Sequence, residues 1–335
     1  MPYVVEGWQA MLRDQPETVP TPVPYTTDPF ASLASSDDDT DGKVQEDHVL
    51  LQRRAGFGGI LKWGLGYGVD MLLRAKDNGK LCVPASFWRP QYEQALAELR
   101  AEAVAAGTDP AAVFLTENDV VTAWIIRCVV RLQTDVRADR TVSGSIVMSL
   151  CKAFEGGDDD SGALLPPADQ HRPYVGNAFG WGNVLVTAGD VRQRPLSWLA
   201  RSVRRTINSQ GTRAQHRAYY RLVRQAGTGL PVVVFGDSNM TQIGFSNWSK
   251  AGLFDFDFAP ARQTSIAGAA TSLAPCRPSY VQENHGPVKP VDGFFILGKD
   301  ALGNYWASAC KLKGQWAQLQ QMLEREPASA DAKDE

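Results

Sequence analysis

Cysteine is scarce and widely spaced in this sequence of 335 residues. The five cysteines, Cys82, Cys128, Cys151, Cys276 and Cys310, lie far apart, and none belongs to a Cys-x-x-Cys pair. This spacing disfavours a structural zinc site and gives no disulfide framework, because both need closely spaced or paired thiols. The pattern is typical of a reducing compartment. We therefore expect a cytoplasmic protein without a metal site.

The sequence also lacks an excess of positive charge. Its 34 Lys and Arg residues stand against 37 Asp and Glu residues, a net charge of −3. Proteins that bind nucleic acids usually present a basic face, so we expect no nucleic-acid partner. The N-terminus has no basic segment followed by an apolar one, which excludes a signal peptide of the usual kind.

One apolar stretch, residues 55–73, approaches the length of a membrane-spanning helix. It carries Lys62, Asp70 and six glycines. Charges are costly at the centre of a bilayer, so a span is not expected. The sequence predicts a buried or interfacial segment instead. The glycines never give Gly-x-Gly-x-x-Gly after a strand, which excludes a dinucleotide-binding loop.

Helix-period and strand-period segments alternate irregularly along the rest of the chain, without a β-α-β rhythm. This predicts an α/β fold, a mixed sheet with flanking helices. Residues 16–47 are proline-rich and then acidic, which is typical of a linker. Helices are predicted at residues 3–13, 90–106, from the capping-box-like Thr116 onward, 195–208, 212–227 and 315–324. Strands are predicted at residues 81–84, 143–150, 183–187 and 231–235, and a hairpin at 293–297 and 305–312.

Residues 235–258 hold the densest group of candidate functional side chains. Gly236-Asp-Ser238 follows an apolar run and resembles the opening block of the GDSL-type hydrolases, with Ser238 as nucleophile. A nucleophilic serine needs an orienting base. That family has an Asp-x-x-His near its C-terminus, whereas here Gln282 stands three residues before His285. A serine esterase is therefore kept only as an alternative.

Five other motifs, in order along the chain, resemble those of the BAHD-type acyl-CoA-dependent acyltransferases. Each motif is weakly specific alone, and together they cover about residues 110–325. They are Thr116-Glu-Asn-Asp119 at a helix start, Tyr174-Val-Gly-Asn-Ala178, Ser246-Asn-Trp248, Asp257-Phe258 nine residues after that tryptophan, and the closing hairpin with Asp292-Gly-Phe-Phe-Ile-Leu-Gly298 and Gly303-Asn-Tyr-Trp306.

This resemblance implies a chloramphenicol-acetyltransferase-like fold of two domains with a channel between them. It implies acyl transfer (EC 2.3.1.-) from acyl-CoA, a co-substrate and not a bound cofactor, to a small-molecule hydroxyl or amine in fungal secondary metabolism. By analogy, the Ser246 hydroxyl and the Trp248 indole N–H would hold the oxyanion. Gly176 and Asn177 become candidates for CoA binding. A monomer is expected for the full-length enzyme.

The sequence departs from the family pattern at two points. The motif Asp257-Phe-Ala-Pro-Ala261 lacks the family's two glycines and tryptophan. We expect Asp257 and Phe258 to be structural, with the carboxylate paired to an arginine such as Arg127. No histidine starts the catalytic His-x-x-x-Asp motif, since Gln52, Val175, Tyr220 and Lys289 stand four residues after the histidines.

The missing motif suggests that this chain is the C-terminal portion of such an enzyme. We expect a remnant helix of the first domain at 1–15, a crossover linker at 16–80, the C-terminal acyltransferase domain at 81–326 and a disordered tail at 327–335. Without its general base, the chain is expected to have little activity alone. A non-catalytic binding protein of the same fold is the second alternative.

Overall fold

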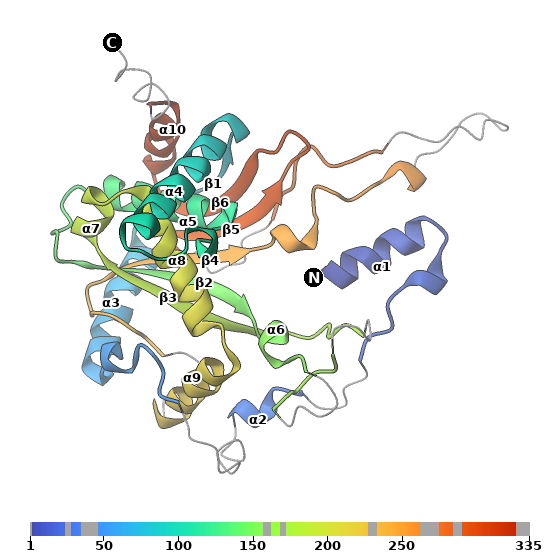
Figure 1. The fold of residues 1–335 in the computed structure, drawn as a ribbon, viewed down its shortest axis with the longest axis horizontal. Coiled ribbons are helices and arrows are strands. Elements are labelled where there is room, and N and C mark those ends of the chain that lie inside the picture. The colour runs from blue at the N-terminus through green and yellow to red at the C-terminus, as the bar shows by residue number, and fades with distance from the viewer. Residues whose placement is uncertain are drawn as a thin grey trace.

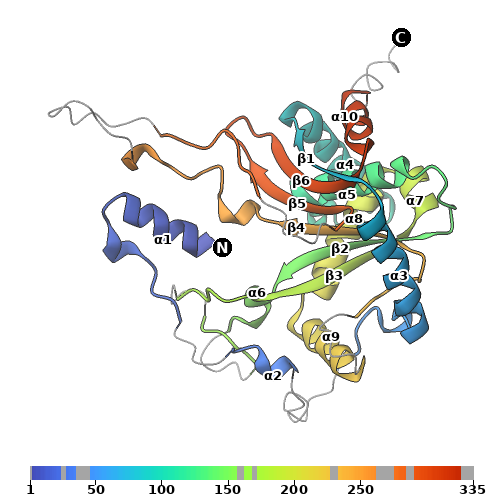
Figure 2. The ribbon, with the colours of Figure 1, turned by 180° about the vertical axis from the view of Figure 1, so that it is seen from behind.

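The computed structural model describes residues 2–23, 28–34, 46–156, 162–167, 172–226, 233–261, 275–283 and 290–325. Within them, six strands form one mixed sheet (Figures 1 and 2). β4 pairs in parallel with β2 and β5, and the other neighbours are antiparallel. This confirms the predicted α/β fold. In spatial order the strands are β1 (Lys76–Val83), β6 (Tyr305–Leu312), β5 (Gly293–Lys299), β4 (Thr241–Asn247), β2 (Thr141–Ser149) and β3 (Phe179–Thr187).

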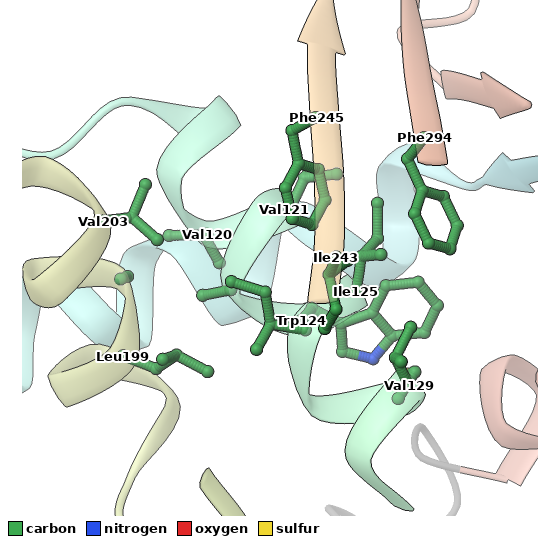
Figure 3. Packing of buried hydrophobic residues seen from close by; sticks show 14 of the residues in the cluster. Val120, Val121, Trp124, Ile125, Val129, Leu199, Val203, Ile243, Phe245 and Phe294 are labelled. Carbon is green, nitrogen blue, oxygen red and sulfur yellow. The ribbon is translucent and has the colours of Figure 1, made fainter. Parts of the chain in front are cut away.

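One face of the sheet carries the main hydrophobic core. Figure 3 shows Ile243 and Phe245 of β4 and Phe294 of β5 facing Trp124 and Ile125 of the central helix. All five side chains are buried, which is what the period-two alternation of a strand with one covered face requires. The helices on this face are α4 (Ala85–Ala105), α5 (Glu117–Leu132), α8 (Leu196–Gln210) and α10 (Gln315–Arg325).

The N-terminus of α5 is fixed by the capping box that the sequence predicts. Thr116 and Asp119 cap each other, and the Thr116 N–H donates to Asp119 Oδ2 at 2.7 Å. Arg204 of α8 donates to the same carboxylate oxygen at 2.6 Å and to Thr116 Oγ1 at 2.8 Å. Asp119 is fully buried, so the guanidinium supplies the partner that a buried charge needs. Through Arg204, the cap therefore also joins α8 to the N-terminus of α5.

The remaining helices lie around the edges and the second face of the sheet. α1 lies apart from the sheet and packs through Trp8 on Phe256, with ring centroids 4.8 Å apart (Figure 1). α3 lies on the opposite face of the sheet from α4 and α5 (Figure 2). These elements are α1 (Pro2–Leu12), α2 (Ala31–Ala34), α3 (Phe57–Leu73), α6 (Leu150–Phe154), α7 (Ala188–Gln193), α9 (Arg213–Ala226) and short 3₁₀ turns at Pro16–Thr18, Leu51–Arg53, Pro110–Ala112, Ser249–Ala251 and Ala259–Ala261.

Four predicted elements differ from the structure by more than two residues or in type. The strand predicted at 183–187 begins at Phe179. The strand predicted at 81–84 begins at Lys76, because its first half pairs with the end of β6. The helix predicted from Pro90 begins at Ala85, where burial of Phe87 and Trp88 holds an extra turn before the proline. Val233–Phe235 forms only an isolated bridge, between Phe235 and Arg54, instead of a strand. Residues 231–232 and the predicted tail lie outside the described residues.

The apolar stretch at 55–73 forms α3 and is only partly buried. Leu61 and Leu65 are 65 % and 70 % exposed, whereas Ile60 and Trp63 pack on the chain beneath. Of the predicted alternatives, a buried or an interfacial segment, full burial does not hold for the outer side of this helix. In the described part of the chain, no helix is both long enough and apolar enough to cross a membrane.

Candidate active site

The second face of the sheet forms the floor of an apolar cavity of about 440 Å³. Alternate residues of four adjacent strands point toward it, on the side opposite the core. α3 contributes Trp63 and Tyr67, and α9 contributes Tyr219. The other lining residues are Ser145, Val147, Phe179, Trp181, Asn183, Val233, Val234, Phe235, Met240, Gln242, Gly244, Phe245, Ser246, Pro290, Val291, Gly293, Phe294 and Phe295.

Ser246 and Trp248, the two predicted oxyanion donors, lie together at the end of β4. The Trp248 indole N–H donates to Ser246 Oγ at 2.9 Å. The Trp248 ring packs edge-on against Phe295 of β5, with centroids 5.4 Å apart. Ser246 lines the cavity, whereas Trp248 does not. The indole N–H is thus engaged by the serine, and the serine keeps its own hydroxyl proton to donate elsewhere.

A chain of polar groups crosses the cavity floor from strand to strand. The Gln242 side-chain amide donates to Ser145 Oγ at 2.6 Å, and Ser145 Oγ donates to Asn183 Oδ1 at 2.7 Å. Behind them, the Gln210 side chain bonds both backbone groups of Asn183. Such a network holds its members rigid inside an otherwise apolar cavity. Sequence reasoning missed Gln242, although its place four residues before Ser246 puts both side chains on one strand face.

Two buried histidines lie behind one wall of the cavity. His48 stacks on Phe235 with centroids 4.7 Å apart, and its Nδ1 accepts from the Leu50 N–H at 3.1 Å. His216 of α9 lies against Gly180 of β3. Burial lowers the pKa of both to about 4, and the mutual proximity of the two histidines adds to the effect on His216. Both side chains are therefore neutral near pH 7.

The other predicted site residues lie away from this cavity. Gly176 and Asn177 are exposed, and Gly176 lies under the Tyr174 ring so closely that a Cβ would meet its hydroxyl at 2.2 Å. The glycine is thus explained by this contact, and the CoA-binding role of the pair stays a prediction.

The structure does not show the predicted pairing of Asp257 with Arg127. Asp257 Oδ1 accepts from the backbone N–H groups of Ala259, at 2.9 Å, and Cys276, at 2.8 Å. These bonds hold the pKa of the carboxyl below its usual value. Arg127 instead donates to the Arg194 carbonyl at 2.6 Å. Asp257 is only partly buried and accepts two backbone N–H bonds, so it needs no arginine partner.

Ser238 lies in a turn at the far end of the same stretch. Gly236 adopts φ +114°, a conformation that favours glycine, and the Met240 N–H donates to the Asp237 carbonyl. The Asp237 carboxylate bonds Thr141 and lies 3.7 Å from Arg53. The turn thus has a structural explanation. His285 lies outside the described residues, so the esterase alternative stays untested. Among the described residues, no cluster of His, Cys, Asp and Glu could hold a metal ion.

The mixed six-stranded sheet and its flanking helices form the chloramphenicol-acetyltransferase-like fold of the BAHD-like acyltransferases. The crystal structure of Fusarium sporotrichioides TRI101 with coenzyme A and T-2 has this fold and superposes on the chain with a TM-score of 0.55. The superposition covers 95% of this chain and 60% of that one, at 14% identity. The resemblance inferred from the five motifs is thereby confirmed at the level of the fold.

Proteins of similar sequence include two from Penicillium species. The acetyltransferase adrJ of Penicillium rubens is 26% identical over 339 residues, which cover 97% of this chain and 63% of the relative. A protein named transcriptional regulator calD, from Penicillium decumbens, is 28% identical over 327 residues, covering 96% and 61%. The chain thus spans less than two thirds of the length of these relatives. No protein-family model matches it.

Proposed function

We propose that the protein to which this chain belongs transfers an acyl group from acyl-CoA to a hydroxyl or amine of a small metabolite. The observation that carries the proposal is the Ser246 hydroxyl, held by Trp248 at the edge of an apolar cavity on the open sheet face. Relatives named acetyltransferase and a fold neighbour solved with coenzyme A support it. Action in the cytoplasm as a monomer, in secondary metabolism, belongs to the same proposal.

In this proposal Ser246 is the oxyanion donor and Trp248 a positioning residue. Acyl transfer passes through a tetrahedral intermediate whose oxygen carries negative charge. The Trp248 N–H bonds Ser246 Oγ, which orients the hydroxyl proton away from the indole and toward the cavity. This refines the earlier expectation that both groups bind the oxyanion directly. A donor held in place before the reaction needs no reorganisation as the charge develops.

The cavity is suited to the acyl acceptor because most of its lining is apolar and aromatic. A site of this kind binds a largely apolar ligand and fixes its orientation with a few polar groups. We assign that orienting role to Gln242, Ser145 and Asn183. The acceptor would then be an apolar molecule that carries at least one hydroxyl or amine.

The general base is the missing element, because residues 1–335 contain no His-x-x-x-Asp. His48 and His216 do not line the cavity, and both are buried. We propose that these residues alone give little or no turnover, since loss of the general base typically lowers the reaction rate about 10²–10⁴-fold. The same observation favours the second candidate, a non-catalytic binding protein of this fold.

The experiment that tests these proposals is an assay of CoA release from acetyl-CoA with hydroxylated apolar acceptors. It compares residues 1–335 with any longer reading frame whose upstream DNA adds an in-frame His-x-x-x-Asp. We expect turnover only from the longer form, and Ser246→Ala should lower its kcat about 10²–10³-fold. Robust turnover by residues 1–335 would contradict the missing-base argument. A longer frame that binds CoA without turnover would favour the binding protein.

Ser238→Ala is the matched control, since this serine lies in a turn outside the cavity. It should leave acyl transfer unchanged. Loss of an esterase activity in Ser238→Ala, with none in Ser246→Ala, would instead establish the hydrolase alternative.

A further inference from the structure

Two polar atoms on the cavity floor have no hydrogen-bond partner in the part of the chain that the structure describes. They belong to a polar row of Gln242, Ser145 and Asn183, in which Gln242 uses its Nε2 and Asn183 its Oδ1. The Gln242 Oε1, an acceptor, and the Asn183 Nδ2, a donor, are left over, and both residues line the cavity. Unpaired polar atoms are costly in apolar surroundings, so a ligand that bonds both atoms is favoured.

The single proton of the Ser145 hydroxyl sets the direction of the polar row. This hydroxyl accepts from the Gln242 amide and donates to Asn183 Oδ1, so Gln242 keeps a carbonyl oxygen and Asn183 an amide NH₂ group for a ligand. Asn183 is held from behind, because Gln210 bonds its backbone N–H at 2.9 Å and its carbonyl at 3.0 Å. A ligand hydroxyl suits the two remaining atoms, since it can donate to one and accept from the other, whereas a ketone oxygen can only accept.

The polar row lies at a fixed distance from Ser246. β4, β2 and β3 are neighbours in the sheet (Figure 2), and Ser145 of β2 is in register with Gly244 of β4 and Asn183 of β3. Gly244 lies two residues before Ser246. Two residues span about 7 Å along a strand and neighbouring strands lie about 5 Å apart, so Ser145 and Asn183 lie about 8 Å and about 12 Å from Ser246. The glycine between them presents no side chain.

Elements of this chain already enclose the polar row. Trp63 and Tyr67 of α3 and Tyr219 of α9 belong to the cavity wall. Ser145 and Asn183 are only 9 % and 8 % exposed. The row is therefore a buried recognition point inside the cavity, and not an outer surface that another polypeptide would cover.

We propose that the acyl acceptor carries a second hydroxyl about 8–12 Å from the one that is acylated, and that the polar row binds this second hydroxyl. The inference rests on the proposed function, which places the reacting hydroxyl beside Ser246. The second hydroxyl donates to Gln242 Oε1 and accepts from Asn183 Nδ2, while an apolar body lies over Gly244. The substrate class is thus an elongated, largely apolar diol, and the polar row selects which of its hydroxyls reacts.

The test measures binding of three rigid probes to the full 335-residue chain by isothermal titration calorimetry. Androstanediol has a hydroxyl at each end of its ring system, androsterone a hydroxyl and a ketone, and androstanol a single hydroxyl. We expect androstanol to bind about 10–100-fold more weakly than androstanediol, because it leaves the polar row unpaired. Androsterone should lie between them, since its ketone accepts from Asn183 but gives Gln242 nothing. Binding requires no general base, so it is measured independently of turnover.

Two serines of β2 provide a matched pair of variants. Ser145→Ala interrupts the polar row, and Gln242→Met removes its free acceptor at similar side-chain length, so both should reduce the preference for the diol to less than about threefold. Ser143→Ala is the control. Ser143 lies two residues before Ser145 on the same strand face, does not line the cavity, and has a buried hydroxyl without a partner in the described part of the chain. Its preference for the diol should be unchanged, and circular dichroism checks the fold of all three variants.

Three results would overturn the inference: no binding of androstanediol by the folded chain, equal affinity for androstanediol and androstanol, or an undiminished preference in Gln242→Met. Failure of the proposed function gives a different result. Acyl transfer by a longer reading frame without a preference for diols would leave the proposed function intact and contradict the polar row. A preference for the diol in binding, without acyl transfer by that longer frame, would contradict the proposed function and leave the polar row as a ligand site.

Discussion

The two buried histidines should make the stability of the protein fall in mild acid. His48 and His216 are 4 % and 2 % exposed, and each has a pKa of about 4 in the folded chain. In the unfolded chain a histidine pKa is about 6.5. Between these values the unfolded state binds protons that the folded state does not, so stability falls as the pH drops below about 6.5.

The size of the effect follows from the two pKa values. Between about pH 7 and about pH 5, one histidine with these values lowers the free energy of unfolding by about 2 kcal/mol, and two give about 4 kcal/mol. Protonation of His48 would also remove the bond that its Nδ1 accepts from the Leu50 N–H. The segment around His48 is held to α9 by the Gln215 side chain, which bonds Glu46 and Val49. As the pH falls, the contact between the segment around His48 and α9 should therefore weaken first.

Urea unfolding followed by circular dichroism at several pH values measures the effect. His48→Phe keeps a ring to stack on Phe235 and removes one titrating group, so the loss of stability between pH 7 and pH 5 should fall by about 2 kcal/mol. Leu222→Ala, a buried apolar change on α9, is the control. It should destabilise by about 2–5 kcal/mol at every pH without changing the slope. An unchanged pH slope in His48→Phe would refute the reasoning.

Three further predictions concern stability, two on the core face of the sheet and one on α3. Asp119→Asn should destabilise the chain by about 3–5 kcal/mol in urea unfolding, because it leaves Arg204 without its buried counter-charge; a change under 1 kcal/mol, about the value of an exposed pair, would contradict the assignment. Gly79→Ala should cost about 1–3 kcal/mol in thermal unfolding, because its Cβ would lie 2.3 Å from the Trp316 ring. Gly66→Ala, in open space on α3, should instead be neutral or stabilise the chain by up to about 1 kcal/mol. A larger loss of stability in Gly66→Ala than in Gly79→Ala would contradict both glycine predictions.

The sequence predicted best where a signal is local. The capping box at Thr116 and Asp119 fixed the start of α5 correctly because its two bonds join residues three apart. The alternation along residues 143–150 identified β2 for the same kind of reason. Arg204, which completes the cap from another helix, carries no local signal and could not have been found in this way.

Prediction failed where tertiary contacts decide. The five residues before Leu81 become strand because β6 extends far enough to pair with them. Val233–Phe235 has a strand-like sequence but makes only one bridge. At the candidate site, Ser246 and Trp248 were recognised from a motif, yet their mutual bond depends on the local geometry at the end of β4. Sequence alone therefore identified Ser246 and Trp248 but not that the indole N–H donates to the serine.

The shape of the cavity floor follows from glycine at two facing positions. Gly244 of β4 is paired in register with Gly293 of β5, between Gln242 and Ser246 on the same strand face. Glycine usually weakens a strand, because it packs nothing and loses more entropy on folding. Here a Cβ at Gly244 would meet only the Gly293 Cα, at 3.8 Å, so packing does not demand the glycine. The absence of a side chain at Gly244 leaves open the space that Ser246 faces, which is the space that the proposed function assigns to the acyl acceptor.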